Sequence, residues 1–146
     1  MTRVLILSAI ANGNSSALRE HAEAFRAAGG DDVEIDVVTF RPAAPLADGE
    51  AAPLAVAPAK ATKKGRAARG ERLVRTATFT SDRWVMARRV RRTPAAVERI
   101  RTADVIYADL PGAVPAGWHA ARANRTAFVT TSAIDAAAAI SERSAR

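Results

Sequence analysis

The chain has 146 residues, of which 49% are hydrophobic, and a formal net charge of +7 at neutral pH. This length fits one domain with a buried core and excludes two full domains, because domains most often contain roughly 100 to 150 residues. The sequence has no cysteine, which excludes disulfides and thiolate metal sites, and no run approaches the roughly 20 apolar residues of a membrane span. We therefore expect residues 1–146 to form a single cytoplasmic domain.

The first apolar run predicts a strand at the centre of a sheet. Val4 to Ser8 is apolar without alternation, which is typical of a strand covered on both faces, as in a parallel sheet. A secretory signal peptide is the competing interpretation, but Val4 to Leu7 is shorter than the roughly 7 to 15 residues of an h-region. The β-branched residues also favour a strand.

A turn, a helix and a second strand follow. Asn12-Gly13-Asn14 predicts a turn, and its last residue or Ser15 can cap a helix whose apolar residues recur at helical spacing over residues 17–28. Gly29-Gly30 ends this helix, and Val33 to Phe40 predicts the next strand. Together these elements form a βαβ unit with a right-handed crossover.

The middle of the chain is Pro/Ala-rich and then basic. We expect a mobile loop over about 41–71, with a short edge strand near 54–57, because proline blocks a helix in its first part and its second part has no apolar stripe. Residues 72–78 fit a helix or a strand equally well. Ser81 can cap a helix from Asp82 to about Arg92, and Pro94 starts a further short helix over 95–101.

The last third of the chain again alternates strands and helices. Asp104 to Asp109 predicts a strand, Val114 to Ala123 a helix with Trp118 on its buried face, Thr126 to Thr131 the last strand, and Ala136 to Arg143 a final helix. The whole pattern predicts a three-layer, Rossmann-like α/β fold with a mostly parallel sheet of four or five strands.

Ligands of such sheets bind beyond the carboxyl ends of the strands, where the turns at 8–16, 109–115 and 130–135 should meet. The first turn offers backbone N–H groups at a helix N-terminus together with hydroxyls, which suit a phosphate or a sugar hydroxyl; a capped helix without a ligand is the alternative. No G-x-G-x-x-G pattern and no P-loop lysine is present. The residues expected to line the site are Asn12, Gly13, Asn14, Ser15, Ser16, Pro111 and Ser132.

Two ionisable residues are candidates for catalytic groups. Asp109, at a strand end, is the best placed general base, with a capping role before Pro111 as its alternative. His119 is expected near the same edge, in a catalytic or a structural role, and His21 is expected to face solvent. Two histidines so far apart in the sequence do not have metal-ligand spacing, so we predict no metal site.

The positive charge is concentrated in one segment. Residues 60–101 hold 14 basic side chains against three acidic ones. Their helical part could bind anionic lipid head groups, could contact nucleic acid, or could be a solvated face; nucleic acid is the less favoured partner because no nucleic-acid motif accompanies it. The residues of this basic helix that would make the contact are Arg83, Trp84, Arg88, Arg89, Arg91 and Arg92.

Several segments resemble the N-terminal domain of family 4-like glycosyltransferases with the GT-B fold. These are the opening strand and glycine-containing loop, the helix over 17–28 with its two following glycines, residues 33–39 (VEIDVVT), residues 103–111 (ADVIYADLP) and residues 129–132 (VTTS). The positions at which that family carries histidines are Tyr107, Asp109 and Ser132 here. The resemblance implies a domain that binds a sugar or lipid-linked acceptor.

The chain has no room for the second, donor-binding domain of such enzymes. The resemblance therefore implies a domain that is incomplete for catalysis alone and that binds an acceptor or pairs with a separate donor-binding chain. We expect no cofactor. The basic helix would hold it on the inner face of an anionic membrane.

Two other functions remain open. The Asn12 to Ser16 loop, with residues 103–111 and Pro115, also resembles flavodoxin-like NADPH-dependent FMN reductases, although residues 111–114 (PGAV) lack the tyrosine and asparagine of that family's flavin loop. The third interpretation is a non-catalytic interaction domain that uses its basic segment as the working surface.

Overall fold

The computed structural model describes residues 1–10, 15–49, 51–58 and 82–145. Its strands form one all-parallel sheet of five strands in the order β3-β2-β1-β4-β5. The strands are β1 (Thr2–Ser8), β2 (Val33–Thr39), β3 (Leu54–Ala55), β4 (Val105–Asp109) and β5 (Phe128–Thr130). The predicted α/β class and parallel sheet are confirmed, and the edge strand predicted near 54–57 is β3.

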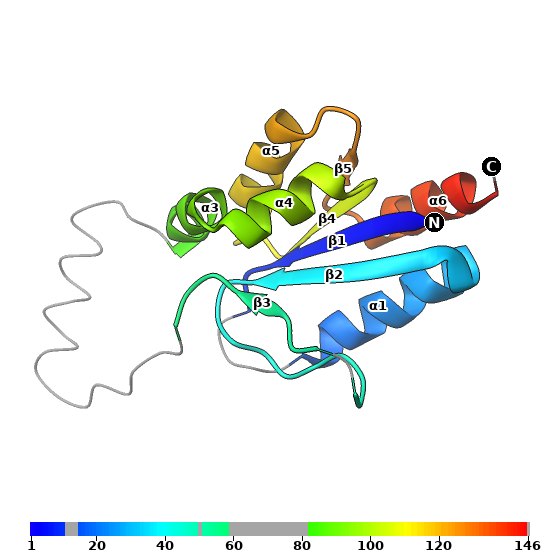
Figure 1. Ribbon diagram of the computed structural model, residues 1–146, viewed down its shortest axis with the longest axis horizontal. Helices are drawn as coiled ribbons and strands as arrows, with labels where there is room; N and C mark the ends of the chain where they lie inside the picture. Colours follow the sequence, from blue (N-terminus) through cyan, green and yellow to red (C-terminus); the bar gives the residue numbers. More distant parts are fainter. Residues whose placement is uncertain (11–14, 50, 59–81, 146) are drawn as a thin grey trace, which may run out of the picture.

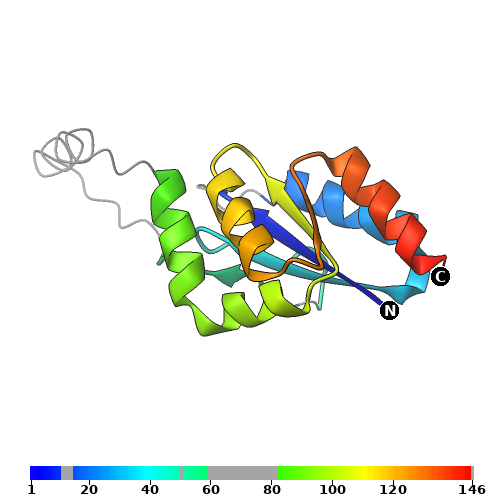
Figure 2. The same cartoon turned by 90° about the horizontal axis from the view of Figure 1, so that it is seen from above.

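Helices cover both faces of the sheet, giving three layers (Figures 1 and 2). On one face α1 packs against α6, and on the other α3, α4 and α5 pack together. The helices are α1 (Ser16–Gly29), α3 (Asp82–Arg92), α4 (Pro94–Thr102), α5 (Val114–Ala123) and α6 (Ala133–Ser144), and a 3-10 turn, η1 (Gly30–Asp32), precedes β2. The predicted Rossmann-like arrangement is therefore present.

The central strand shows why its sequence lacks alternation. Val4 and Ile6 point into the core beneath α1 and α6, whereas Leu5 and Leu7 point into the core beneath α3, α4 and α5. All four are at most 1% exposed, because a strand between two helical layers buries both of its faces.

Helix α5 lies unusually close to the sheet, and this corrects one prediction. A Cβ on Gly117 would lie 2.9 Å from the Cβ of Ala108 in β4, so only glycine allows this approach. The buried residues of α5 are Ala116, Gly117 and Ala120, while Trp118 is 52% exposed. The prediction that Trp118 lies on the buried face is wrong, because small residues form the contact with the sheet.

At the amino ends of the strands, the Asn124 side chain links the segments that lead into β4 and β5. Its buried Nδ2 donates to the carbonyl oxygens of Ile100 and Ala103, each at 2.8 Å, and to that of Arg101 at 3.2 Å. Its Oδ1 accepts from the backbone N–H groups of Thr126 and Ala127 and from the Thr126 hydroxyl. The side chain thus fixes the start of β4 against the start of β5.

The Pro/Ala-rich segment after β2 contributes to the cores in its described part. Leu46, Val56 and Ala57 are each at most 9% exposed. The backbone N–H groups of Val56 and Ala57 donate to the carbonyl oxygens of Thr39 and Phe40. The rest of the loop predicted over 41–71, the ambiguous segment 72–78 and the predicted Ser81 cap lie outside the described residues.

Candidate functional site at the carboxyl edge of the sheet

The carboxyl ends of β1 and β4 form the topological switch point of the sheet. After β1 the chain turns to α1 on one face, and after β4 it turns to α5 on the other (Figure 1). Parallel α/β sheets bind ligands in the crevice that such a divergence leaves. The two loops touch here, since a Cβ on Gly112 would lie 2.6 Å from the Cβ of Ala9.

Polar residues stand side by side at the ends of three neighbouring strands. Ser8 of β1 pairs in register with Thr39 of β2 on one side and with Asp109 of β4 on the other. Paired residues of a parallel sheet share a face, and this row lies on the α1 side. Thr39 and Ser8 are fully buried and Asp109 is 4% exposed. At the ends of these strands, the core therefore contains hydrogen-bonding groups in place of apolar side chains.

Asp109 is the centre of a cluster that we name the carboxylate cluster, formed by Ser8, His21, Tyr107 and Asp109. Its Oδ2 accepts from the Ser8 hydroxyl at 2.8 Å, and its Oδ1 lies 3.5 Å from the Tyr107 hydroxyl and 3.7 Å from Nε2 of His21. Buried carboxylates are stable only with such partners. None of these three contacts is a cap of the turn that follows Asp109.

His21 contradicts the prediction that it faces solvent. Its side chain is 27% exposed, and Nε2 lies 3.3 Å from the Tyr107 hydroxyl. Its ring also meets the Tyr107 ring edge-on, with centroids 5.0 Å apart, and lies 6.3 Å from the Phe25 ring. Position 21 lies at the margin of the apolar stripe of α1, where a side chain can reach the end of the sheet while keeping contact with water.

Burial raises the pKa of the Tyr107 hydroxyl above its usual value, and the negative charge of Asp109 and the hydrogen bond to it act in the same direction. Tyr107 is therefore a neutral hydroxyl at physiological pH. It donates to Asp109 and lies within hydrogen-bond distance of Nε2 of His21.

Two further hydroxyls, those of Thr39 and Ser15, belong to this edge of the sheet. The Thr39 hydroxyl is fully buried and has no hydrogen-bond partner among the described residues. Ser15 occupies the N-cap position of α1, as one prediction had it, but its side chain makes no capping hydrogen bond. The N–H groups at a helix N-terminus can hold an anion or a hydroxyl.

The other predicted site residues are distributed around this edge. Ser132 caps α6, since its hydroxyl accepts from the N–H of Asp135 at 3.2 Å, and Pro111 is exposed in the loop after β4. Ser16 is the first residue of α1. Asn12, Gly13 and Asn14 lie outside the described residues.

The structure does not bring His119 and Asp109 together. His119 lies on α5, over the other face of the sheet, where burial and the neighbouring Arg91 and Arg122 lower its pKa. Its ring packs against Trp118, with centroids 4.9 Å apart. The histidine that meets Asp109 is His21, and the catalytic roles of Asp109 and His119 stay predictions.

The first residue after Asp109 has an unusual backbone conformation. Leu110 has φ of +68°, in the left-handed region that branched side chains seldom adopt. Such conformations cost on the order of 1 kcal/mol or more and concentrate at ligand sites. Leu110, Val114 and Ile134 are 50%, 43% and 82% exposed, so an apolar rim follows the ends of β4 and β5.

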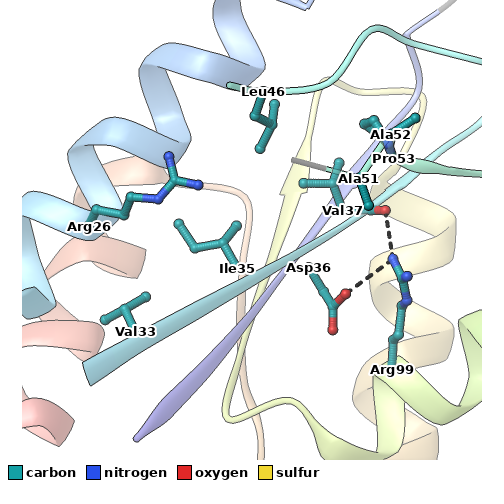
Figure 3. Close-up of a pocket in the computed structure, with 10 residues that line it drawn as sticks. All are labelled: Arg26, Val33, Ile35, Asp36, Val37, Leu46, Ala51, Ala52, Pro53 and Arg99. Atoms are coloured by element: carbon teal, nitrogen blue, oxygen red, sulfur yellow. Dashed lines mark hydrogen bonds and ion pairs between the residues drawn. The ribbon is translucent and has the colours of Figure 1, made fainter. Parts of the chain in front are cut away.

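A separate pocket of about 360 Å³ lies at the outer side of β2 (Figure 3). Val33, Ile35 and Val37 line it, and Arg99 closes one side through Asp36 at 3.2 Å and the carbonyl oxygen of Val37 at 3.1 Å. It shares no residue with the carboxylate cluster. The contacts of Arg99 are those expected of a side chain that fastens α4 to β2.

Within the described ranges, no group of three histidine, aspartate or glutamate side chains could hold a metal ion, and no helix is long and apolar enough to cross a membrane. Comparisons with protein-family models, with curated proteins and with solved structures find no match for this chain. The assignment of a function therefore depends on the site itself.

Proposed function

We propose that this chain is an acceptor-binding domain of the glycosyltransferase type, which binds the hydroxyl-bearing group of a sugar or lipid-linked acceptor at the carboxyl edge of its sheet. The observation that supports this most is the row Thr39, Ser8 and Asp109 with His21 beside it. His21 is the member of this group that is open to solvent, and its imidazole can hydrogen-bond a hydroxyl of a polyhydroxylated ligand.

The strand order favours this proposal over flavin binding. The two-residue strand β3 pairs with the outer side of β2, which gives the order β3-β2-β1-β4-β5 of Rossmann domains. The flavodoxin order has no strand on that side of β2. The apolar rim of Leu110, Val114 and Ile134 offers a surface for the lipid part of an acceptor. A separate donor-binding chain would supply the activated sugar.

The test is a titration of isotope-labelled protein followed by amide chemical shifts. Octyl glucoside below its micelle concentration is the probe, and methyl glucoside, which has the same sugar without the tail, is its control. We expect shifts at Ser8, His21, residues 109–110 and residues 112–114 with both glucosides, and stronger binding of the octyl form. Shifts confined to other surfaces contradict the proposal, and purified protein that carries flavin absorbance overturns it in favour of FMN binding.

We further propose that α3 holds the domain on an anionic membrane. All five of its arginines are exposed, none has an acidic partner among the described residues, and Trp84 is 55% exposed between them. Trp84, Val85 and three of the arginines line a hollow of about 400 Å³ on this helix. Arginines around an exposed tryptophan favour a surface of negative head groups with an apolar layer beneath.

Vesicle co-sedimentation tests this contact. Each arginine near an anionic surface contributes about 1 kcal/mol, so R88Q/R92Q should weaken binding to phosphatidylglycerol vesicles about thirtyfold. The control R101Q/R125Q removes the same charge from exposed arginines outside α3 and should have a smaller effect. Binding that ignores salt or is equal on neutral vesicles contradicts the proposal, and salt-sensitive binding to nucleic acid alone favours that partner instead.

A further inference from the structure

The hydrogen-bond pattern of the carboxylate cluster favours one of the two neutral tautomers of His21. An ionised carboxylate only accepts, and hydrogen bonds to it are the strongest available here. The hydroxyls of Ser8 and Tyr107 therefore both donate to Asp109, at 2.8 Å and 3.5 Å. The oxygen of Tyr107 then accepts from Nε2–H of His21, 3.3 Å away.

This chain of bonds leaves Nδ1 of the neutral His21 as an unprotonated acceptor. Nδ1 has no hydrogen-bond partner among the described residues, although the ring is held from two sides by Tyr107 and Phe25. The side chain keeps 27% of its surface open, while the other three members of the cluster are at most 5% exposed. His21 is therefore the member of the cluster that a ligand reaches first.

We propose that Nδ1 of His21 is the hydrogen-bond acceptor for a ligand hydroxyl, and that Tyr107 and Asp109 are positioning residues that select the Nε2–H tautomer of the neutral ring. The proposal rests on the acceptor-binding function, because it names the residue that holds the acceptor hydroxyl. It assigns the role to His21 and not to His119, whose α5 lies over the opposite face of the sheet.

Nitrogen NMR of the imidazole tests the tautomer without any ligand. The chain has two histidines, so the variant His119→Gln leaves the signals of His21 alone. At a pH where the imidazole is neutral, we expect the Nε2–H tautomer, and a mixture of tautomers once Tyr107→Phe removes the accepting oxygen. A predominant Nδ1–H tautomer in the presence of Tyr107 overturns the proposal.

Binding of octyl glucoside tests the contact itself. His21→Ala should weaken binding about threefold to tenfold, the range for one hydrogen bond, and Tyr107→Phe should weaken it although His21 is still present. Glu20→Ala, an exposed neighbour on α1, is the control and should bind as the natural chain does. If His21→Ala binds octyl glucoside as tightly as the natural chain, the role of His21 is wrong but the acceptor-binding function can still hold. If the natural chain binds neither glucoside, both the acceptor-binding function and the role of His21 are contradicted.

Discussion

Asn124→Ala should be among the most destabilising substitutions in the described part of the chain, although it lies far from the site. Two buried carbonyl oxygens, those of Ile100 and Ala103, lose their 2.8 Å donor. Each unsatisfied buried group costs about 1 to 3 kcal/mol, so we expect a loss of about 3 to 4 kcal/mol. At about 3 °C per kcal/mol for a chain of this size, the Tm falls by about 10 °C.

Urea and thermal unfolding followed by circular dichroism measure this loss. Thr126→Ala is the matched control, because it removes one hydrogen bond to the same amide at an exposed residue and should cost less than about 1 kcal/mol. Asn124→Asp keeps the accepting oxygen but replaces the donating amide by a carboxylate oxygen that faces the two carbonyls. It should therefore be at least as destabilising as alanine. A loss below about 1 kcal/mol for Asn124→Ala, or a milder effect of aspartate, refutes the argument.

Three further predictions concern the switch point and its surroundings. Tyr107 is the only tyrosine, so its absorbance titration should have a midpoint above 10.0 that falls in Asp109→Asn. Stability should decline as the pH rises from 10.0, where the unfolded state ionises, to that midpoint. Gly112→Ala should lower the free energy of unfolding in urea by about 1 to 3 kcal/mol, because the added Cβ would lie 2.6 Å from the Cβ of Ala9. Ala9→Gly should restore most of this loss. Because the pKa of His119 is lowered from 6.5, stability should fall as the pH drops below that value, and His119→Gln should flatten the slope; an unchanged slope contradicts this.

The strands and helices follow closely from local patterns in the sequence. The continuous apolar run of β1 and the double glycine after α1 specify these elements without knowledge of their neighbours, and Val114 to Ala123 was predicted with the bounds that α5 has. The prediction that Trp118 is buried was wrong because the size of an apolar side chain does not alone decide its burial. A helix that approaches the sheet through Gly117 has no space for an indole on the same face.

The partners of Asp109 could not be predicted in the same way. Ser8 is 101 positions away from it, and His21 is 86 positions away from Tyr107. These contacts depend on which strands are neighbours and on their register. A local sequence pattern predicts neither the neighbouring strand nor the register. One signal was available, because residues 105, 107 and 109 of a strand share a face, so Tyr107 had to lie beside Asp109.

The topology explains why only one of the two histidines belongs to the carboxylate cluster. From the centre of the sheet, the crossover through α1 leads from β1 outward to β2, and the crossover through α5 leads from β4 outward to β5, in the opposite direction. Right-handed crossovers that run in opposite directions lie on opposite faces of a sheet. Once β1 and β4 are neighbours, His21 and His119 must therefore be on different sides, and the register that turns Asp109 toward α1 selects His21 as its partner.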